Sequence, residues 1–423
     1  MKLILRNGYT ILNGERLKRD IIIENGIITS YELPEILTNN DIEIDLNGKL
    51  ITPGLVDLHV HLREPGFTHK ETILTGTQAA ARGGFTTICV MPNTKPVPET
   101  PELIYDFYQK CKTDAQVNVF TYAPITLSLV SNELSDQKSL LEAGAIAFTN
   151  DGVGVQDANT MFEAMKFASL NNAIIAAHAE DDSLKGNGVL HQGKVASTLN
   201  IPGIPSVSES TQVARDVLLA EAANARYHVC HVSAKETVRV IREAKKAGIK
   251  VSAEVTPHHL LLSEDDIKEL NTNYKMNPPL RSKEDQEALI EGLLDGTLDC
   301  IATDHAPHHE DEKKLGMLKA PFGIIGLEYA FALLYTKLVK TGVINLNQLI
   351  EWMTIKPSQC FKLDCGSLDI GKKADISVFD LETKVEISNQ FVSKSSNSPF
   401  IGQSVYGDCV LTLVNGEIKW RKM

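Results

Sequence analysis

The chain has 423 residues, of which 43% are hydrophobic and 23% are charged, a composition typical of a globular protein that is too long for one simple core. Its 42 basic and 54 acidic residues give a formal charge of −12, which argues against nucleic acid or an anionic membrane as partner and requires a local positive site for any anionic substrate. The seven cysteines include no CxxC pair, the first residues lack a signal-peptide pattern, and the apolar runs are too short to span a membrane. We therefore expect a cytoplasmic protein with reduced thiols.

Both ends of the chain carry short β-type segments. Runs of β-branched or aliphatic residues lie at 3–5, 21–23, 42–44, 375–379 and 409–414. Asn-Gly pairs, which favour tight hairpin turns, follow or separate these runs at Asn7-Gly8, Asn25-Gly26 and Asn415-Gly416. Because the two ends share this pattern and the middle does not, we expect residues 1–52 and 363–423 to form one discontinuous, β-sandwich-like domain.

Residues 53–362 show a different pattern, in which strand-like runs alternate with helical segments. The strand-like runs lie at 55–61, 86–91, 117–123, 145–150, 173–178, 227–232, 250–255 and 300–303. Helical segments are expected at 72–82, 211–223, 235–247 and 283–294. Eight strands that alternate with helices predict an α/β fold of the (β/α)8 TIM-barrel type. A doubly wound sheet is the alternative, although no glycine-rich nucleotide-binding motif follows any of these strands.

Polar residues stand where these strand-like runs end. His59 and His61 share one face of the first run and would point into a barrel at the end where such enzymes build their sites. Four later runs end at or near Asp151, His178, His231 and Asp304. Each of these residues alone would more often be a cap, a turn residue or a hydrogen-bonded histidine. Together, four histidines and two aspartates suit a pair of first-row divalent ions, with zinc as the expected metal.

Five sequence motifs lie in order along the chain. They are HVHLREPG at 59–66, MPNT at 91–94, KMNPPLR at 275–281, TDHAPH at 303–308 and APFGIIG at 320–326. Together they resemble the motifs of bacterial type I dihydroorotases, which belong to the amidohydrolase superfamily, and the similarity extends over essentially the whole chain. The resemblance implies the reversible cyclisation of N-carbamoyl-L-aspartate to (S)-dihydroorotate and water, a step of de novo pyrimidine biosynthesis.

The resemblance also implies a role for each residue at the strand ends. His59, His61 and Asp304 would bind the first of two zinc ions per subunit, and His178 and His231 would bind the second. Asp151 would bridge the two ions, in the place of the carboxylated lysine that hydantoinases and many other relatives use. The surrounding segment, FTNDGVGVQ, contains no lysine. Asp304 would also be the catalytic residue that accepts a proton from the attacking water and passes it to the departing nitrogen.

A second group of residues would hold the substrate, again as the resemblance implies. These are His61, Arg63, Asn93, Asn277, His308, Phe322 and Gly323. The guanidinium of Arg63 suits a substrate that carries two carboxylates, because it can bind a carboxylate through two parallel hydrogen bonds. The charged stretch HHEDEKKLGMLK at 308–319 favours a solvated loop, with a closing lid as the alternative. Residues 393–398, SKSSNS, are expected to be no more than a short polar loop.

Other functions compete with this interpretation. Asp151 in place of lysine, together with Arg63, argues against a hydantoinase or dihydropyrimidinase, and Arg63 with Asn93 and Asn277 argues against an allantoinase. A non-enzymatic subunit that only supports aspartate transcarbamoylase would typically lack metal ligands, whereas all six are present here. The family resemblance suggests a homodimer, with association with aspartate transcarbamoylase as an additional partner hypothesis.

Overall fold

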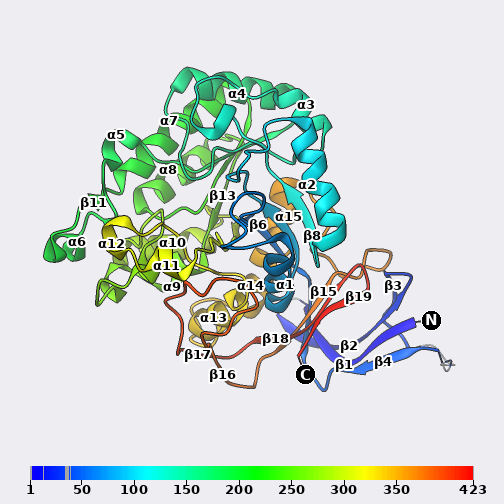
Figure 1. The fold of residues 1–423 in the computed structure, drawn as a ribbon. Helices are drawn as coiled ribbons and strands as arrows, with labels where there is room; N and C mark the ends of the chain where they lie inside the picture. Colours follow the sequence, from blue (N-terminus) through cyan, green and yellow to red (C-terminus); the bar gives the residue numbers. More distant parts are fainter. Residues whose placement is uncertain (1, 13, 34–37, 39, 423) are drawn as a thin grey trace.

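The structure of the protein, a computed structural model, describes residues 2–12, 14–33, 38 and 40–422. It is an α/β structure in which a large sheet, lower right in Figure 1, carries both chain ends and adjoins a body of alternating strands and helices. Within the described residues, each helix is too short or too polar to cross a lipid bilayer.

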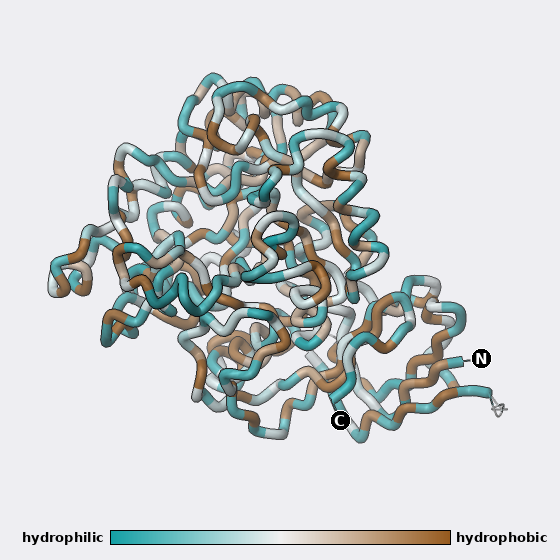
Figure 2. Tube along the Cα trace, in the orientation of Figure 1, coloured by the Kyte–Doolittle hydropathy of each residue, from teal (hydrophilic) through white to brown (hydrophobic). Residues whose placement is uncertain are grey.

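Strands from both ends of the chain share one sheet. Among the described residues its eight strands are β1 (Lys2–Leu12), β2 (Glu15–Glu24), β3 (Ile27–Ser30), β4 (Ile42–Asp45), β5 (Leu50–Pro53), β15 (Ile376–Asp380), β18 (Asp408–Val414) and β19 (Glu417–Arg421). The order is β19-β18-β15-β5-β1-β2-β3, and β4 pairs with β1. The antiparallel pair β5–β15 joins the two halves, with Ile51 opposite Val378. Both residues belong to an apolar cluster that also contains Leu5, Ile21 and Leu413. Figure 2 shows hydrophobic and hydrophilic stretches along the strands of this sheet.

The Asn-Gly pairs of this sheet have two different structural roles. Asn25-Gly26 and Asn415-Gly416 connect β2 to β3 and β18 to β19, and all four residues have positive φ, as a tight hairpin turn of the predicted type requires. The prediction of a turn at Asn7-Gly8 is wrong. There β1 continues through a register shift between Leu5 and Gly8, because a positive φ at one residue of a strand accommodates a bulge as readily as a turn.

The middle of the chain contains parallel strands whose pairing forms a closed ring. The strands are β6 (Leu55–Val60), β7 (Phe85–Val90), β8 (Asn118–Thr121), β9 (Ile174–Ala177), β12 (Arg226–Val229), β13 (Val251–Val255) and β14 (Cys300–Ile301). They form the sheets β6-β7-β8 and β9-β12-β13-β14. Phe148 bridges the sheets by pairing with Ala123 beyond β8 and with Ile175 of β9, and His305 beyond β14 pairs with Val60 of β6. The strand ends that follow one another in sequence therefore meet at one rim.

The segment expected to form a strand at 145–150 pairs with both of its neighbours. Main-chain hydrogen bonds join residues 146–149 to Thr121 and Ala123 on one side and Phe148 to residues 174 and 176 on the other. Just after this segment, the side-chain Oδ1 of Asn150 accepts hydrogen bonds from the backbone N–H groups of Ile125 and Thr126, so a side chain continues the pairing where the main-chain pairing ends.

Helices surround the parallel ring (Figure 1). They are α1 (Ile73–Gly83), α2 (Pro101–Asp114), α3 (Gln137–Glu142), α4 (Ala158–Leu170), α7 (Val207–Ala223), α8 (Lys235–Lys246), α10 (Lys283–Leu294), α14 (Leu346–Met353) and α15 (Ile355–Phe361). Their starts follow from the sequence, since Thr72, Thr100, Asp157 and Ser282 each accept a hydrogen bond from a backbone N–H of the first turn. The predicted helices are confirmed, and α7 begins four residues earlier than expected.

Shorter elements extend the loops above the rim. They are α5 (Asp182–Lys185), β10 (Leu190–His191), α6 (Lys194–Leu199), β11 (Gly203–Ile204), α9 (Pro257–Leu261), α11 (Glu310–Lys313), α12 (Gly316–Lys319), α13 (Ala330–Leu334), β16 (Val385–Glu386) and β17 (Ser404–Val405). Ile387, Phe400 and Val405, around the β16–β17 pair, pack in one apolar cluster with Met276 and Met317. Residues 385–405 therefore leave the terminal sheet and lie against the loops of the ring.

Candidate active site

The residues predicted from the sequence gather around one cavity at the carboxyl-end rim of the parallel ring. Its volume is about 290 Å³. The predicted residues that line it are His61, Arg63, Asn93, Asp151, His178, His231, Asn277, Asp304, His308, Phe322 and Gly323. His59 is fully buried and contacts two of these residues, Asp151 and Asp304. Four residues that were not predicted also line the cavity: Gly152, Lys185, Ala306 and Pro321.

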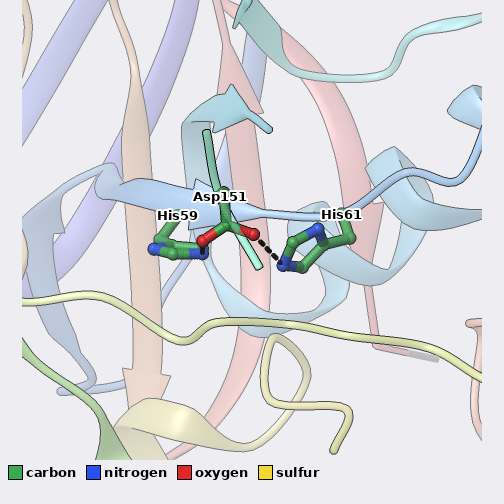
Figure 3. Close-up of side chains that lie close together, drawn as sticks. All are labelled: His59, His61 and Asp151. Atoms are coloured by element: carbon green, nitrogen blue, oxygen red, sulfur yellow. Dashed lines mark ion pairs between the residues drawn. The ribbon is translucent and has the colours of Figure 1, made fainter. Parts of the chain in front are cut away.

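The carboxylate of Asp151 lies between His59, which belongs to β6, and His61, which directly follows the end of β6. Figure 3 shows its two oxygens facing the two imidazole rings. Oδ1 is 3.3 Å from His59 Nε2, and Oδ2 is 3.5 Å from His61 Nε2. Because His59 and His61 are two residues apart on one extended segment, both rings reach the same carboxylate.

Three further side chains complete this group. His231 Nε2 lies 3.6 Å from Asp151 Oδ1 and 3.0 Å from His178 Nδ1. Asp304 Oδ1 lies 3.0 Å from His61 Nε2 and 3.5 Å from His59 Nε2. We call the six residues His59, His61, Asp151, His178, His231 and Asp304 the metal cluster, because their ligand atoms converge on one small volume.

The metal cluster has the polar atoms that a divalent ion would satisfy. His59 Nε2 and Asp151 Oδ1 are both buried and have no hydrogen-bond partner among the residues that the structure describes. Leaving such atoms without a partner is costly in a protein interior. Two sets of three ligand atoms, His59-His61-Asp151 and Asp151-His178-His231, each fall within 4.8 Å of one another. Imidazole nitrogens and carboxylate oxygens at this spacing fit first-row divalent metals.

Electrostatics keep the two carboxyl groups of the cluster ionised. Burial alone would raise the pKa of Asp151 and of Asp304, but the adjacent histidines outweigh burial, and both pKa values lie below their ordinary range. For His59, burial alone would lower the pKa, but the carboxylates of Asp151 and Asp304 outweigh burial and raise it. The cluster therefore offers two carboxylates in the form that binds a cation or accepts a proton.

The opposite wall of the cavity is formed by Arg63, His308 and residues near Phe322. Arg63 Nε donates to Pro307 O at 3.2 Å, and burial lowers the pKa of Arg63 to about 10, which leaves it cationic at neutral pH. His308 Nε2 lies 2.8 Å from Phe322 O, and Lys70 Nζ lies 3.3 Å from His308 Nδ1. Arg63 Nη2 also lies 3.2 Å from His308 Nε2, so one ring nitrogen contacts both the Phe322 carbonyl and the Arg63 guanidinium, and the other contacts the Lys70 ammonium. Burial and the cations Arg63 and Lys70 lower the pKa of His308, so the ring is neutral.

Three of the predicted residues have an unusual backbone conformation. Arg63, His231 and Asp304 have φ values of 59°, 32° and 48°, in a region that residues other than glycine, asparagine and aspartate seldom adopt. Such conformations cost on the order of 1–3 kcal/mol each and are concentrated at functional sites, where the surrounding structure holds them. Among the described residues other than glycine and asparagine, positive φ occurs at these three and also at Ser128, Leu129 and Lys362, which do not line the cavity.

Comparison with known proteins agrees with this geometry. The family model described as "Dihydro-orotase-like" matches residues 48–237. The chain is 58% identical to a protein named dihydroorotase from Macrococcus caseolyticus over 100% of this chain and 99% of that one. The chain belongs to the dihydroorotase family. It is also 56% identical to a dihydroorotase from Staphylococcus aureus, over 99% of each chain, and to one from Bacillus caldolyticus, over 99% of this chain and 98% of that one.

Solved structures that resemble this member of the dihydroorotase family are cyclic amidohydrolases. An L-hydantoinase from Arthrobacter aurescens superposes with a TM-score of 0.89 at 27% identity, covering 99% of this chain and 96% of that chain. A dihydropyrimidinase from Brevibacillus agri superposes with a TM-score of 0.86 at 26% identity, covering 100% and 95%. The arrangement of terminal sheet and parallel ring is therefore one that this dihydroorotase-family chain shares with amidohydrolases.

Two buried glutamates that support the metal cluster were missed by the sequence analysis. Glu254 Oε1 lies 2.8 Å from His59 Nδ1, and Oε2 lies 3.1 Å from His228 Nε2. Burial would raise its pKa, but His228 and His59 outweigh burial and lower the pKa to about 2. The sequence did contain an indication of this role: Glu254 is a charged residue inside the apolar run VSAEV at 251–255, and a charge buried in a strand requires a partner.

Glu180 supports the other side of the cluster. It accepts a hydrogen bond from Asn277 Nδ2 at 3.0 Å and lies 3.5 Å from His178 Nε2 and 2.5 Å from Lys185 Nζ. Asn93, predicted to bind substrate, contacts the metal cluster in this structure: its Oδ1 lies 2.9 Å from His61 Nδ1, and its Nδ2 lies 3.3 Å from Asp151 Oδ2. Carboxylates and amides that orient the second nitrogen of a histidine are typical of metal sites.

Proposed function

We propose that the chain catalyses the reversible cyclisation of N-carbamoyl-L-aspartate to (S)-dihydroorotate with release of water, the dihydroorotase step of de novo pyrimidine biosynthesis. One observation carries this proposal above the others: the metal cluster and the half-buried guanidinium of Arg63 face the same cavity. The substrate has one carboxyl group that must react and one that must be held, and the cavity offers a metal-type donor set and a cation for these two tasks. The full-length identity to proteins named dihydroorotase supports the same reaction.

We further propose that two zinc ions occupy the metal cluster. His59, His61 and Asp304 would hold one, His178 and His231 the other, and Asp151 would bridge them. The position of the Asp151 carboxylate supports a bridging role, since Oδ2 faces His61 while Oδ1 faces His231. When bound, such ions would lower the pKa of the attacking water and polarise the amide carbonyl of the ring.

Asp304 is the proposed catalytic residue. Its ionised carboxylate contacts His61 at 3.0 Å and lines the cavity, so it can accept a proton from water in the hydrolytic direction. It then gives this proton to the ring nitrogen as the C–N bond breaks. In the biosynthetic direction the ureido nitrogen gives up a proton to Asp304 as the ring closes, and Asp304 passes it to the departing oxygen. Because the reacting carboxyl group starts as a carboxylate, one further proton from solvent completes the water.

We assign the free carboxylate of the substrate to Arg63, Asn93 and His308, and the ring to Asn277 and the backbone of Phe322 and Gly323. His61 would contact substrate as well as metal. The half-buried Arg63 side chain supports this assignment, because a partly desolvated guanidinium binds a carboxylate more strongly than an exposed one.

We interpret the closed parallel ring as a (β/α)8 barrel spanning residues 53–362, with residues 1–52 and 363–423 as a discontinuous β-domain. The cyclic strand pairing supports a barrel, and cavities at the carboxyl ends of barrel strands are typical of barrel enzymes. The family resemblance further suggests a cytoplasmic homodimer, which light scattering on the purified protein would test. Association with aspartate transcarbamoylase is a separate hypothesis that co-purification of the two proteins would test.

Hydantoinase or dihydropyrimidinase activity is the competing proposal, because the solved structures named above carry those titles. Hydantoin and dihydrouracil have no carboxylate substituent, so for those substrates the half-buried Arg63 would remain without an anionic partner, at a desolvation cost. Asp151 also stands where hydantoinases use a carboxylated lysine. Both features favour dihydroorotase.

Steady-state assays with the zinc-loaded protein separate these activities. Dihydroorotate, hydantoin, dihydrouracil and allantoin would be compared at equal enzyme concentration, with the metal content measured by elemental analysis. We expect hydrolysis of dihydroorotate with kcat/KM at least a hundredfold above the other three. Activity on none of the four substrates by fully metal-loaded protein would falsify the proposal, and a preference for hydantoin or dihydrouracil would replace it.

A further inference from the structure

Residues 308–323 form the wall of the cavity opposite the metal cluster, and we call them the substrate wall. The sequence favoured a solvated loop here, with a closing lid as the alternative. Most of the charged residues of this stretch are exposed, but Lys313 and Met317 are buried, with 6% and 4% of their surface accessible. A lysine buried to this degree is rare unless its ammonium has partners.

The ammonium of Lys313 is bound by backbone carbonyls. Nζ donates to Lys275 O at 3.2 Å, to Pro321 O at 3.1 Å and to Gly323 O at 3.0 Å. Within the described chain no carboxylate lies within 4 Å of this ammonium. In its protonated form the Lys313 amine has three donors, so the three carbonyls then use its full capacity and connect the end of α11 to residues on both sides of the cavity.

Lys275 connects the same two segments from the other side, through its own ammonium group. Its buried ammonium donates to Met317 O at 2.7 Å and to Leu318 O at 3.3 Å, and it lies 4.5 Å from the centre of the Phe322 ring. The backbone N–H of Gly323 donates to Lys275 O at 3.0 Å. The two lysines therefore fasten the substrate wall to the segment that carries Asn277, two residues after Lys275.

A third fastening comes from the far end of the chain. Asn397, in the stretch predicted to be a simple polar loop, is buried. Its Nδ2 donates to Ala306 O and to Gly323 O, both at 3.0 Å, and its Oδ1 accepts from the backbone N–H of His308 at 3.1 Å. Gly323 O is thus the acceptor that Lys313 and Asn397 share.

Gly323 packs closely against Ala306 and His308, with no space for a Cβ atom. Its φ is +148°, and a Cβ placed there would lie 2.7 Å from Ala306 O and 2.8 Å from His308 Cδ2. Such distances are shorter than van der Waals contact, so only glycine allows the two ends of the substrate wall to approach this closely. The hydrogen bonds of Lys313 and Asn397 therefore meet at the point where the two ends of the substrate wall lie closest together.

We propose that Lys313 and Asn397 are positioning residues that hold His308 and the backbone of Gly323 in a preformed substrate-binding wall. The inference rests on the proposed function, since it takes His308 and Gly323 as substrate contacts. A wall that is ordered before binding adds no ordering cost to each substrate-binding event. The segment is therefore a fixed part of the site and does not act as a lid.

Four variants test the proposal by steady-state kinetics on dihydroorotate. Lys313→Met keeps the length of the side chain and removes all donors, Lys313→Arg keeps charge and donors, and Asn397→Ala removes the third fastening. Lys314→Met is the matched control, because Lys314 is the exposed neighbour that pairs only with acidic residues of its own segment. We expect KM to rise about tenfold in Lys313→Met and Asn397→Ala, equivalent to loss of about 1.4 kcal/mol of binding, with kcat within threefold of wild type. Lys313→Arg should recover most of the loss.

A merely structural role would lower the active fraction, and with it kcat and metal content, while leaving KM unchanged. That result, or wild-type KM in both variants with normal metal content, overturns the proposal. If Lys313→Met does not fold, Asn397→Ala decides by the same criterion.

Hydrogen–deuterium exchange of the wild-type holoenzyme provides a test that needs no variant. We expect peptides covering 306–324 to be protected to the same extent with and without dihydroorotate. Protection that arises only on addition of dihydroorotate would indicate a lid and overturn the proposal. A wild-type enzyme inactive on dihydroorotate would instead refute the proposed function, and the exchange of the ligand-free protein would still show whether the wall is preformed.

Discussion

The metal cluster and the substrate wall face each other across one cavity, but they are held in place by different means. Each member of the metal cluster stands at or just beyond a strand or bridge of the parallel ring, so strand register sets its position. The substrate wall has no long element of its own and is held by buried side chains that donate to backbone carbonyls. The comparison teaches that the reacting groups depend on the register of the sheet, whereas the binding groups depend on a few buried hydrogen bonds.

The largest expected effect is at the metal cluster itself. Asp304→Asn preserves shape but removes the carboxylate that accepts and donates the proton, so we expect kcat to fall by about a thousandfold with KM changed much less. Single-turnover and steady-state kinetics on dihydroorotate measure this, with elemental analysis to separate loss of proton transfer from loss of metal. A kcat near that of wild type would remove Asp304 from the mechanism.

A smaller effect is expected one layer further out, at Glu254. Glu254→Gln removes the charge that orients His59 Nδ1, and loss of such a partner typically lowers metal affinity by about 10–100-fold. Competition with a chromophoric chelator measures the affinity, and Glu291→Gln, at an exposed position of α10, serves as the control. Equal metal affinity in the Glu254 variant and wild type would show that strand register alone suffices to orient the cluster.

The smallest effect concerns the buried support of the substrate wall. Burial lowers the pKa of Lys313 to about 7, whereas lysine in an unfolded chain titrates near ~10.4. Between these values the unfolded state binds a proton that the folded state lacks, so the free energy of unfolding rises with pH by up to about 1.4 kcal/mol per pH unit. Below about pH 7 Lys313 is protonated in both the folded and the unfolded protein, so its contribution to the free energy of unfolding no longer changes with pH.

Thermal unfolding of wild type and Lys313→Met at pH 7.5 and pH 9.0 isolates this contribution, since groups common to both proteins cancel. We expect the Tm of wild type to rise relative to that of the variant by about 2 °C between the two pH values. A Tm difference that stays constant or changes in the opposite direction would contradict a lowered pKa at Lys313.

The same contrast explains what the sequence could and could not predict. His231 and Asp304 were predictable because polar residues at the ends of apolar runs are unusual, and the carboxyl ends of parallel strands meet at one rim. Glu254 left a weaker signal as a charge inside an apolar strand. Lys313 and Asn397 left none, because each donates to carbonyl groups that are distant in sequence, and a lysine or asparagine in a polar stretch is usually solvated.

The fold follows the same division. The Asn-Gly hairpins of the terminal sheet and the capped helices were predictable from local sequence, because their determinants lie within a few residues. The bulge at Asn7-Gly8, where a turn was expected, was not, since β1 continues there in its pairing with β2. Local patterns determine which elements form, and pairing with neighbouring strands determines whether an Asn-Gly pair becomes a turn or a bulge.

One cavity is lined on one side by the metal cluster, which carries the reacting groups, and on the other side by the substrate wall, which binds the substrate. Anomalous diffraction at the zinc edge, recorded from crystals of the zinc-loaded protein grown with dihydroorotate, tests this arrangement most directly. We predict two anomalous peaks within the metal cluster, on either side of Asp151, and the ligand carboxylate on Arg63 with its ring against Phe322 and Gly323. Metal peaks elsewhere, or a ligand bound away from the substrate wall, would contradict the account.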